Sequence, residues 1–182
     1  MMKTSRVLIV GALPPPVSGM VMINKKMSLI LNKKTKVYEI NIRPKIKFKS
    51  VNFIIKIFNA LHKSFWAIGS YKKWDVLYVG LSGGLGQIYD SIFILIARLF
   101  KKRIFLHHHS FAYINKYKIH FRILCMIAGS KCTHITLSEG MSTKLMSNYH
   151  LIKDTRVVSN SAFIDSQELN NNVLVDNLKV GF

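Results

Sequence analysis

Arg6-Val-Leu-Ile-Val10 and the turn after it, Gly11-Ala-Leu-Pro-Pro-Pro-Val-Ser-Gly19, set the pattern that the rest of the chain follows. An apolar run bounded by Gly and Pro is typical of a buried strand in a parallel sheet, and the pattern after Gly19 indicates a helix. A strand, a turn and a helix in this order can present free backbone N–H groups to an anion. The prolines stiffen the turn ahead of Ser18 and Gly19, whose backbone is unobstructed. A proline-rich connector without a chemical role is the alternative.

Strand and helix patterns alternate along the chain, which predicts βαβ units. We expect strands at 6–10, 36–41, 75–79, 104–109, 133–137 and 155–158, and helices at 20–31, 51–68, 87–100, 114–128 and from 138. The expected fold class is α/β, a Rossmann-like doubly wound parallel sheet of about six or more strands with helices on both faces. Residues 1–165 form this domain, residues 166–177 are a polar linker, and residues 178–182 begin a second, truncated domain.

The composition predicts a folded domain with an anionic partner. Hydrophobic residues make up 49% of the 182 residues, which suits one domain with a sizeable core. Lysine and arginine number 27 against 8 acidic residues, a formal charge of +19. Nucleic acid, an anionic bilayer and phosphate-bearing substrates would all respond to that charge. No nucleic-acid partner is expected, because the sequence contains no helix-turn-helix, RNA-recognition or zinc-finger pattern.

The cysteines and the apolar runs favour a cytoplasmic protein. Cys125 and Cys132 have no second cysteine pair nearby, so buried free thiols are expected rather than a zinc site or a disulfide. The apolar part of the N-terminus is too short for a signal peptide. The run from Ser91 to Leu99 is interrupted by Arg98 and is far shorter than the ~20 residues that span a bilayer. We expect a cytoplasmic protein that is soluble or peripheral on the inner face of the cytoplasmic membrane.

The predicted third strand is followed by a glycine-rich loop, Gly80-Leu-Ser-Gly-Gly-Leu-Gly86. Neither this loop nor the opening turn has the spacing of a dinucleotide fingerprint or a Walker motif, which disfavours a nucleotide-dependent oxidoreductase. Gly83 and Gly84 allow close backbone approach at the carboxyl edge of the sheet, where doubly wound folds bind ligands.

The predicted fourth strand ends in His107, His108 and His109. Strand alternation places His107 and His109 on one face and His108 on the other. Adjacent residues of one strand rarely converge on one ion, so no metal site is expected. A histidine at this edge can bond a sugar hydroxyl or accept its proton, because the pKa of imidazole lies near neutrality. A purely structural role is the alternative for two of the three.

A basic segment with aromatic residues is a candidate membrane surface. The predicted membrane-facing residues are Lys45, Lys47 and Lys49 of the loop at 43–49, and Lys56, Lys63 and Trp66 of the helix at 51–68. This helix has apolar Phe58, Leu61, Phe65 and Ile68 away from its lysine stripe. A basic amphipathic element of this kind suits an anionic bilayer. An ordinary helix with one face on the sheet remains equally open.

The order of these features resembles the amino-terminal domain of GT-B glycosyltransferases, closest to family 4, so that the chain would be one GT-B half. The residues that support the resemblance are Leu13-Pro-Pro-Pro-Val-Ser-Gly19, Asp75-Val-Leu-Tyr-Val79 with its glycine loop, Ile104-Phe-Leu-His-His-His-Ser110, Ile135-Thr-Leu-Ser138 and Val157-Val-Ser-Asn160. The similarity extends over nearly the whole chain.

The resemblance implies roles for four of these residues. Ser18 and Gly19 would lie beside the donor phosphates in an interdomain cleft, although family members commonly have two glycines there. His109 would be the catalytic histidine near the acceptor and the transferred sugar. His107, with the glycine loop, would lie at the acceptor edge of the cleft.

The implied activity is transfer of a sugar from a nucleotide-sugar to a lipid-linked or saccharide acceptor in cell-surface polysaccharide biosynthesis. Retention of configuration, no metal and no cofactor beyond the nucleotide-sugar co-substrate are expected. The donor-binding domain, with its paired glutamates, would be lost or separately encoded. The alternative is a non-catalytic Rossmann-like module that docks on an anionic membrane or on a partner protein.

Overall fold

The structure is a computed structural model that describes residues 5–15, 17–42 and 52–163, without the side chains of 52–54 and 56. The strands are β1 (Val7–Gly11), β2 (Val37–Asn41), β3 (Val76–Gly80), β4 (Arg103–His107), β5 (Thr133–Thr136) and β6 (Asp154–Val157). The α-helices are α1 (Gly19–Asn32), α2 (Asn52–Gly69), α3 (Gln87–Leu99), α4 (Ala112–Asn115), α5 (Ile119–Ala128) and α6 (Glu139–Asn148). Short 3₁₀ turns are η1 (Tyr71–Lys73), η2 (Gly84–Gly86) and η3 (Asn160–Phe163).

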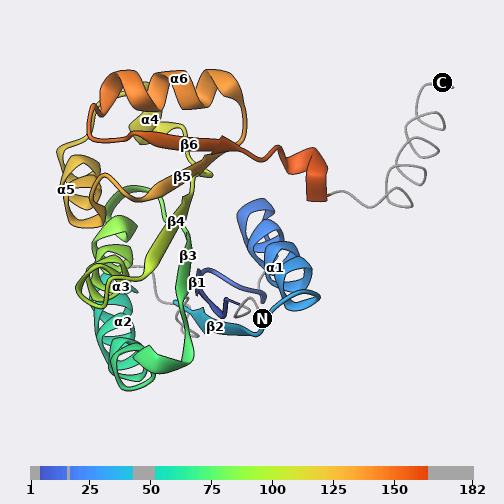
Figure 1. The fold of residues 1–182 in the computed structure, drawn as a ribbon. Helices are drawn as coiled ribbons and strands as arrows, with labels where there is room; N and C mark the ends of the chain where they lie inside the picture. The colour runs from blue at the N-terminus through green and yellow to red at the C-terminus, as the bar shows by residue number, and fades with distance from the viewer. Residues whose placement is uncertain (1–4, 16, 43–51, 164–182) are drawn as a thin grey trace, which may run out of the picture.

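The strands form one six-stranded parallel sheet in the order β2-β1-β3-β4-β5-β6 (Figure 1). The apolar runs predict this arrangement correctly, because strands covered on both faces are hydrophobic almost throughout. The chain leaves β1 toward β2 and then returns to β3 on the other side of β1. The fold therefore has a topological switch point between β1 and β3.

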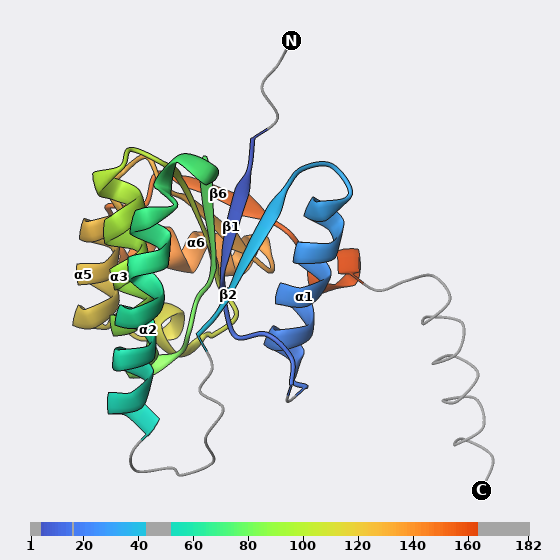
Figure 2. The same cartoon turned by 90° about the horizontal axis from the view of Figure 1, so that it is seen from below.

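The helices cover both faces of the sheet, as expected. Parallel crossovers are right-handed, so a reversal of strand order moves the connecting helix to the other face. Figure 2 shows α1 alone on one side and α2, α3 and α5 together on the opposite side. The larger apolar core lies under α2, α3, α5 and α6, and a smaller one lies between α1 and the sheet.

The helix expected at 114–128 is divided in two in the structure. α4 ends at Asn115, and the backbone is extended at Lys116 and Lys118 before α5 begins. The backbone N–H of Lys118 donates to the hydroxyl of Tyr149 at 2.8 Å, and that hydroxyl donates to the carbonyl of Tyr113 at 2.7 Å. A side chain from the segment after α6 thus satisfies backbone groups that a continuous helix would have paired internally.

The predicted linker at 166–177 and the second domain at 178–182 lie outside the described residues, and both stay predictions. Cys125 and Cys132 are free and buried, as predicted. None of the described helices is long and apolar enough to cross a membrane.

One buried side-chain amide packs against the ends of both strands at the switch point. The side chain of Asn24, in α1, donates from Nδ2 to the carbonyl of Ala12 at 3.1 Å. A Cβ added at Gly80 would lie 2.2 Å from Asn24 Oδ1, and one added at Gly11 would lie 2.9 Å from Nδ2. The ends of β1 and β3 are therefore glycines because the amide occupies the space of two side chains.

Substitution Gly80→Ala should destabilise the fold, because the new methyl group overlaps a buried amide that has little room to move. We expect a loss of about 1–3 kcal/mol in the free energy of unfolding, measured in urea. Gly140→Ala, in α6, is the matched control, because a Cβ there meets nothing within 4 Å. Equal stabilities of the two variants would contradict the close packing.

Candidate functional site

The turn after β1 brings Ser18 and Gly19 to the carboxyl edge of the sheet. The side chain of Asn41, at the end of β2, accepts from the Leu13 N–H and donates to the Leu13 carbonyl, both at 3.2 Å. Ser18 is extended at the N-cap of α1, and its side chain makes no capping bond. Ser18 and Gly19 are exposed, so the first turn of α1 presents its unpaired N–H groups to solvent.

The loop after β3 is held by a buried acid. The backbone N–H of Ser82 donates to Asp90 Oδ2 at 2.7 Å, and the Ser82 hydroxyl donates to Oδ1 at 3.3 Å. Complete burial raises the pKa of Asp90 to about 7, against the hydrogen bonds from Ser82. Gly83 and Gly84 remain exposed, and Gly84 has a positive φ of 57° that favours glycine.

The histidines follow directly beside this loop. The backbone N–H of Leu81 donates to the carbonyl of His107 at 3.0 Å, and a Cβ at Gly83 would lie 3.8 Å from the Ser110 hydroxyl. The structure therefore brings the β3 loop and the end of β4 together. Ser18 and Gly19 share this edge but form no hydrogen bond with either segment within the described ranges.

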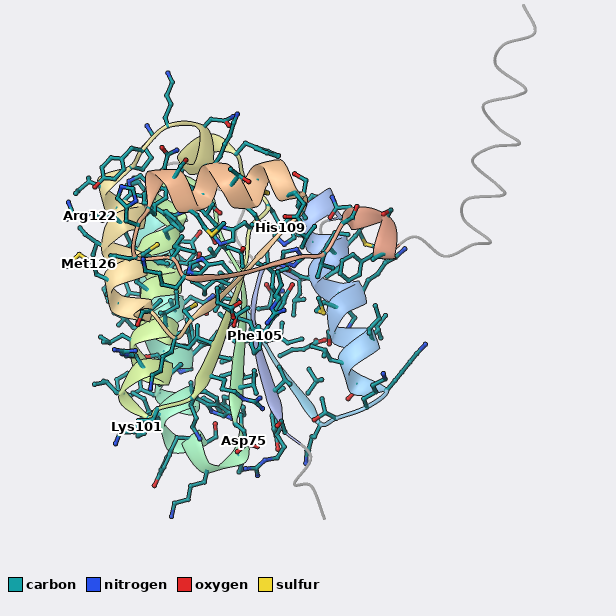
Figure 3. All side chains as sticks on the ribbon, turned by 45° about the horizontal axis from the view of Figure 1, so that its top comes forward. Asp75, Lys101, Phe105, His109, Arg122 and Met126 are labelled. Atoms are coloured by element: carbon teal, nitrogen blue, oxygen red, sulfur yellow. The ribbon has the colours of Figure 1, made fainter. Side chains whose placement is uncertain are left out.

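His107 and His109 share one face, as alternation predicts, with their ring centroids 4.1 Å apart. Figure 3 shows His109 above Phe105, at the end of the sheet where α1 begins. The hydroxyl of Tyr78 lies 2.5 Å from His107 Nδ1. Burial raises the pKa of Tyr78, so the hydroxyl keeps its proton and can donate it to Nδ1, which leaves the proton of the neutral ring on Nε2.

Both rings are held in their neutral form. Burial lowers the pKa of His107 to about 3, with a smaller contribution from His109, and lowers the pKa of His109 to about 4. The expectation of a histidine with a pKa near neutrality is therefore wrong for His109. A neutral imidazole still offers one donor and one acceptor to a hydroxyl group.

His108 belongs to a separate buried chain on the helical face. Its Nδ1 lies 3.0 Å from the Tyr113 hydroxyl, and its Nε2 lies 2.9 Å from Nδ1 of His134. Burial lowers the pKa of His134 to about 4 and that of His108 far below its ordinary value. His108 packs against Tyr113 of α4 and Phe121 of α5, and its ring stacks on His134, which indicates a structural role for both rings.

Several buried polar atoms at the carboxyl edge lack a hydrogen-bond partner within the described part of the chain. They are Nε2 of His107 and His109, Oδ1 of Asn24, and both amide atoms of Gln87. Buried polar groups are ordinarily paired, so unpaired ones at one edge indicate a place where a ligand or water bonds. The histidines were predicted from the sequence, whereas Asn24, Gln87 and Asp90 were not. An acid and an amide in the first turns of an otherwise apolar helix were the available signal for Gln87 and Asp90.

The predicted membrane-facing residues are only partly described. Lys45, Lys47 and Lys49 lie outside the described residues, as does the side chain of Lys56. Lys63 donates to the carbonyl of Asn41, and Trp66 lies against Tyr38 of β2 with ring centroids 5.8 Å apart. Lys63 and Trp66 thus border β2, and their membrane role stays a prediction. No group of three His, Cys, Asp or Glu side chains within the described residues could hold a metal ion.

No protein-family model matches the sequence, and no curated protein matches it. Among solved structures, the chain is similar to HepE from Anabaena in complex with UDP and glucose. That match has 12% identity and a TM-score of 0.51, and it covers 86% of this chain and 44% of that chain. It is also similar to UDP-N-acetylglucosamine 2-epimerase from Rickettsia bellii, with 14% identity, a TM-score of 0.63, and coverage of 97% and 52%. These likenesses show a GT-B-like, Rossmann-type fold, and the chain spans about half the length of each neighbour.

Stability should fall as the medium becomes acid, because the buried imidazoles must be charged. An unfolded histidine binds its proton near pH 6.5, whereas folded His107 and His134 bind theirs only near pH 3 and 4. Below pH 6.5 the unfolded chain therefore binds more protons than the folded chain. At pH 5 each of these buried histidines lowers the free energy of unfolding by about 2 kcal/mol. Urea unfolding at pH 7 and pH 5 measures this loss. An unchanged free energy of unfolding at pH 5 would contradict the neutral assignment.

Asp90 should shift stability in the opposite direction. The pKa of Asp90 is about 7 in the folded chain, above its ordinary value of 3.8. The folded chain therefore binds this proton more tightly than the unfolded chain does. The resulting stabilisation is fully present in acid and is lost as the pH rises through 7. Asp90→Asn still accepts from the Ser82 N–H but does not titrate. On going from pH 8 to pH 6, the wild type should gain about 1 kcal/mol relative to this variant. The histidine contributions cancel in the comparison, so parallel pH profiles would refute the raised pKa.

Proposed function

We propose that the chain is the acceptor-binding half of a GT-B glycosyltransferase that transfers a sugar from a nucleotide-sugar to a lipid-linked or saccharide acceptor. The observation that supports this most is the set of buried polar atoms at the carboxyl edge, beside the switch point, that have no partner within the described part of the chain. Ligands of open α/β sheets bind at this place. The solved neighbours contain UDP and glucose in one case, and are named for a UDP-sugar in the other.

In this proposal the neutral His109 contacts a hydroxyl group of the acceptor. Its Nε2 is buried and has no hydrogen-bond partner among the described residues, and the neutral ring can form a hydrogen bond with a hydroxyl group there. His107, fixed through Nδ1 by Tyr78, positions the ring of His109 by direct contact. Gly83 and Gly84 form the neighbouring wall, where the absence of side chains leaves room for a ring.

In this proposal the phosphates of the sugar donor bind at the start of α1. Ser18 and Gly19 expose N–H groups there, and the helix dipole favours an anion. The groups that hold the nucleotide itself would come from a second α/β domain, in a reaction with retention and without a metal. Synthesis of cell-surface polysaccharide at the cytoplasmic membrane face is the proposed setting.

His109→Ala should weaken acceptor binding by about tenfold, because one buried hydrogen bond to the substrate is lost. Histidine ring signals in NMR spectra of the full chain, titrated with candidate saccharides, measure the binding. The signals of His109 should move, whereas those of the exposed His150 should not, and His150→Ala is the matched control.

A saccharide response that survives His109→Ala unchanged would remove this residue from the site. Efficient transfer from UDP-sugars by the chain alone would contradict the need for a second domain.

A further inference from the structure

The helical layer opposite α1 has an apolar outer surface. In this layer α3 packs between α2 and α5, and the three helices lie side by side on one face of the sheet (Figure 2). Each helix buries one stripe on the sheet, so its opposite stripe points to solvent. Such outward stripes are ordinarily polar.

On α2 the outward stripe consists of large apolar side chains. These exposed residues are Phe58, Leu61, Phe65 and Ile68. The side toward the sheet instead has the small Ala60, Ser64 and Ala67, all buried. The small residues let α2 approach the sheet closely, and the bulky ones remain outside.

The neighbouring helices bury large side chains on the sheet, such as Phe93 of α3 and Phe121 of α5, but they also expose apolar ones. These exposed residues include Leu95 and Leu99 in the later turns of α3, and Ile119, Ile123 and Met126 on α5. Phe65 is 73% exposed, Leu99 69% and Met126 60%. Figure 3 shows Met126 projecting from α5 away from the sheet. We call these side chains, with the four of α2, the outer apolar face. Large exposed apolar side chains gathered on adjacent helices indicate an interaction site.

The charges around this face are almost all positive. Within the described helices α2, α3 and α5 the only acidic residue is Asp90, which is buried. Arg98, Lys101 and Lys131 line a hollow of about 560 Å³ at the carboxyl ends of α3 and α5. Arg122 projects from the outward stripe of α5, beside Met126 (Figure 3).

Two kinds of occupant could cover an apolar face: a second copy of the chain or a surface of opposite charge. Two copies packed through this face would bring their positive borders together, at a net charge of +19 each. An anionic bilayer offers an apolar interior for the side chains and negative headgroups for the borders. The combination of apolar centre and basic border therefore favours the bilayer.

We propose that the outer apolar face docks on the surface of an anionic phospholipid bilayer. Phe65, Leu99 and Met126 enter the boundary between headgroups and acyl chains, and the hollow at Arg98, Lys101 and Lys131 receives a lipid phosphate. This surface shares the apolar residues of α2 with the element predicted from the sequence, but it extends over α3 and α5, and its cations are Arg98, Lys101 and Lys131. It does not rest on the proposed sugar transfer, because either activity can exist without the other.

Co-sedimentation of the full chain with vesicles tests the proposal. The wild type should bind vesicles of phosphatidylcholine with phosphatidylglycerol, and binding should weaken as sodium chloride is raised. The combined variant Phe65→Ser, Leu99→Ser, Met126→Ser should lose about tenfold or more in affinity. Leu29→Ser with Ile30→Ser is the matched control, because these exposed residues lie on α1, across the sheet. Circular dichroism verifies that each variant is folded.

A charge variant separates the two parts of the surface. Arg98→Gln, Lys101→Gln, Lys131→Gln should bind anionic vesicles no better than vesicles of phosphatidylcholine alone. The proposal is overturned if the apolar variant binds as the wild type does, or if the α1 control loses as much affinity. It is also overturned if the wild type ignores vesicles and forms a dimer that the apolar variant abolishes, since the face would then bind a second copy.

Discussion

The packing of the Asn24 amide against Gly11 and Gly80 is the constraint on which the candidate site depends. It joins the ends of the two central strands where the connection reverses direction, and so fixes where the β1 turn and the β3 loop depart from the sheet. Ligands of open α/β sheets bind at the switch point, outside the carboxyl ends of these strands. A single side chain from α1 packs against both strand ends there. One of its own polar atoms, Oδ1, remains unpaired among the described residues.

The charge of the chain and the candidate site are separate in space. Around the histidines, the described groups at the carboxyl edge are mainly imidazoles, amides, hydroxyls and bare backbone, and burial keeps His107 and His109 uncharged. Many of the exposed cations lie elsewhere, around the hollow at Arg98 and Lys131 and along the helical layer. A sugar is suited to the first environment, because it is recognised by hydrogen bonds. A negatively charged surface is suited to the second.

Periodicity and glycine placement predicted the strands, their parallel arrangement and the two-sided helical cover. The break between α4 and α5 was not predictable, because it depends on the Tyr149 hydroxyl, which arrives from a later segment. The amphipathic pattern of α2 located two stripes but could not tell which one meets the sheet. Close packing selected the small Ala60 and Ala67 and left Phe65 outside, against the usual preference for burying the larger side chain. In the site, His109 was found because histidines at a strand end are conspicuous, whereas Asn24 acts through glycines far away in the sequence.

The bond from the Ser82 N–H to Asp90 also affects how distant relatives of this chain can be recognised. The donor is a backbone group, so the residue at 82 can change without loss of the bond, whereas the acceptor is a side chain and cannot. Glycine loops such as Gly83-Gly84 vary in length and composition at little thermodynamic cost. At the 12–14% identity between this chain and its solved neighbours, the likeness is therefore one of fold rather than of loop motifs. In this loop the hydrogen bond depends on the side chain of Asp90, which is buried one turn into the helix after the third strand.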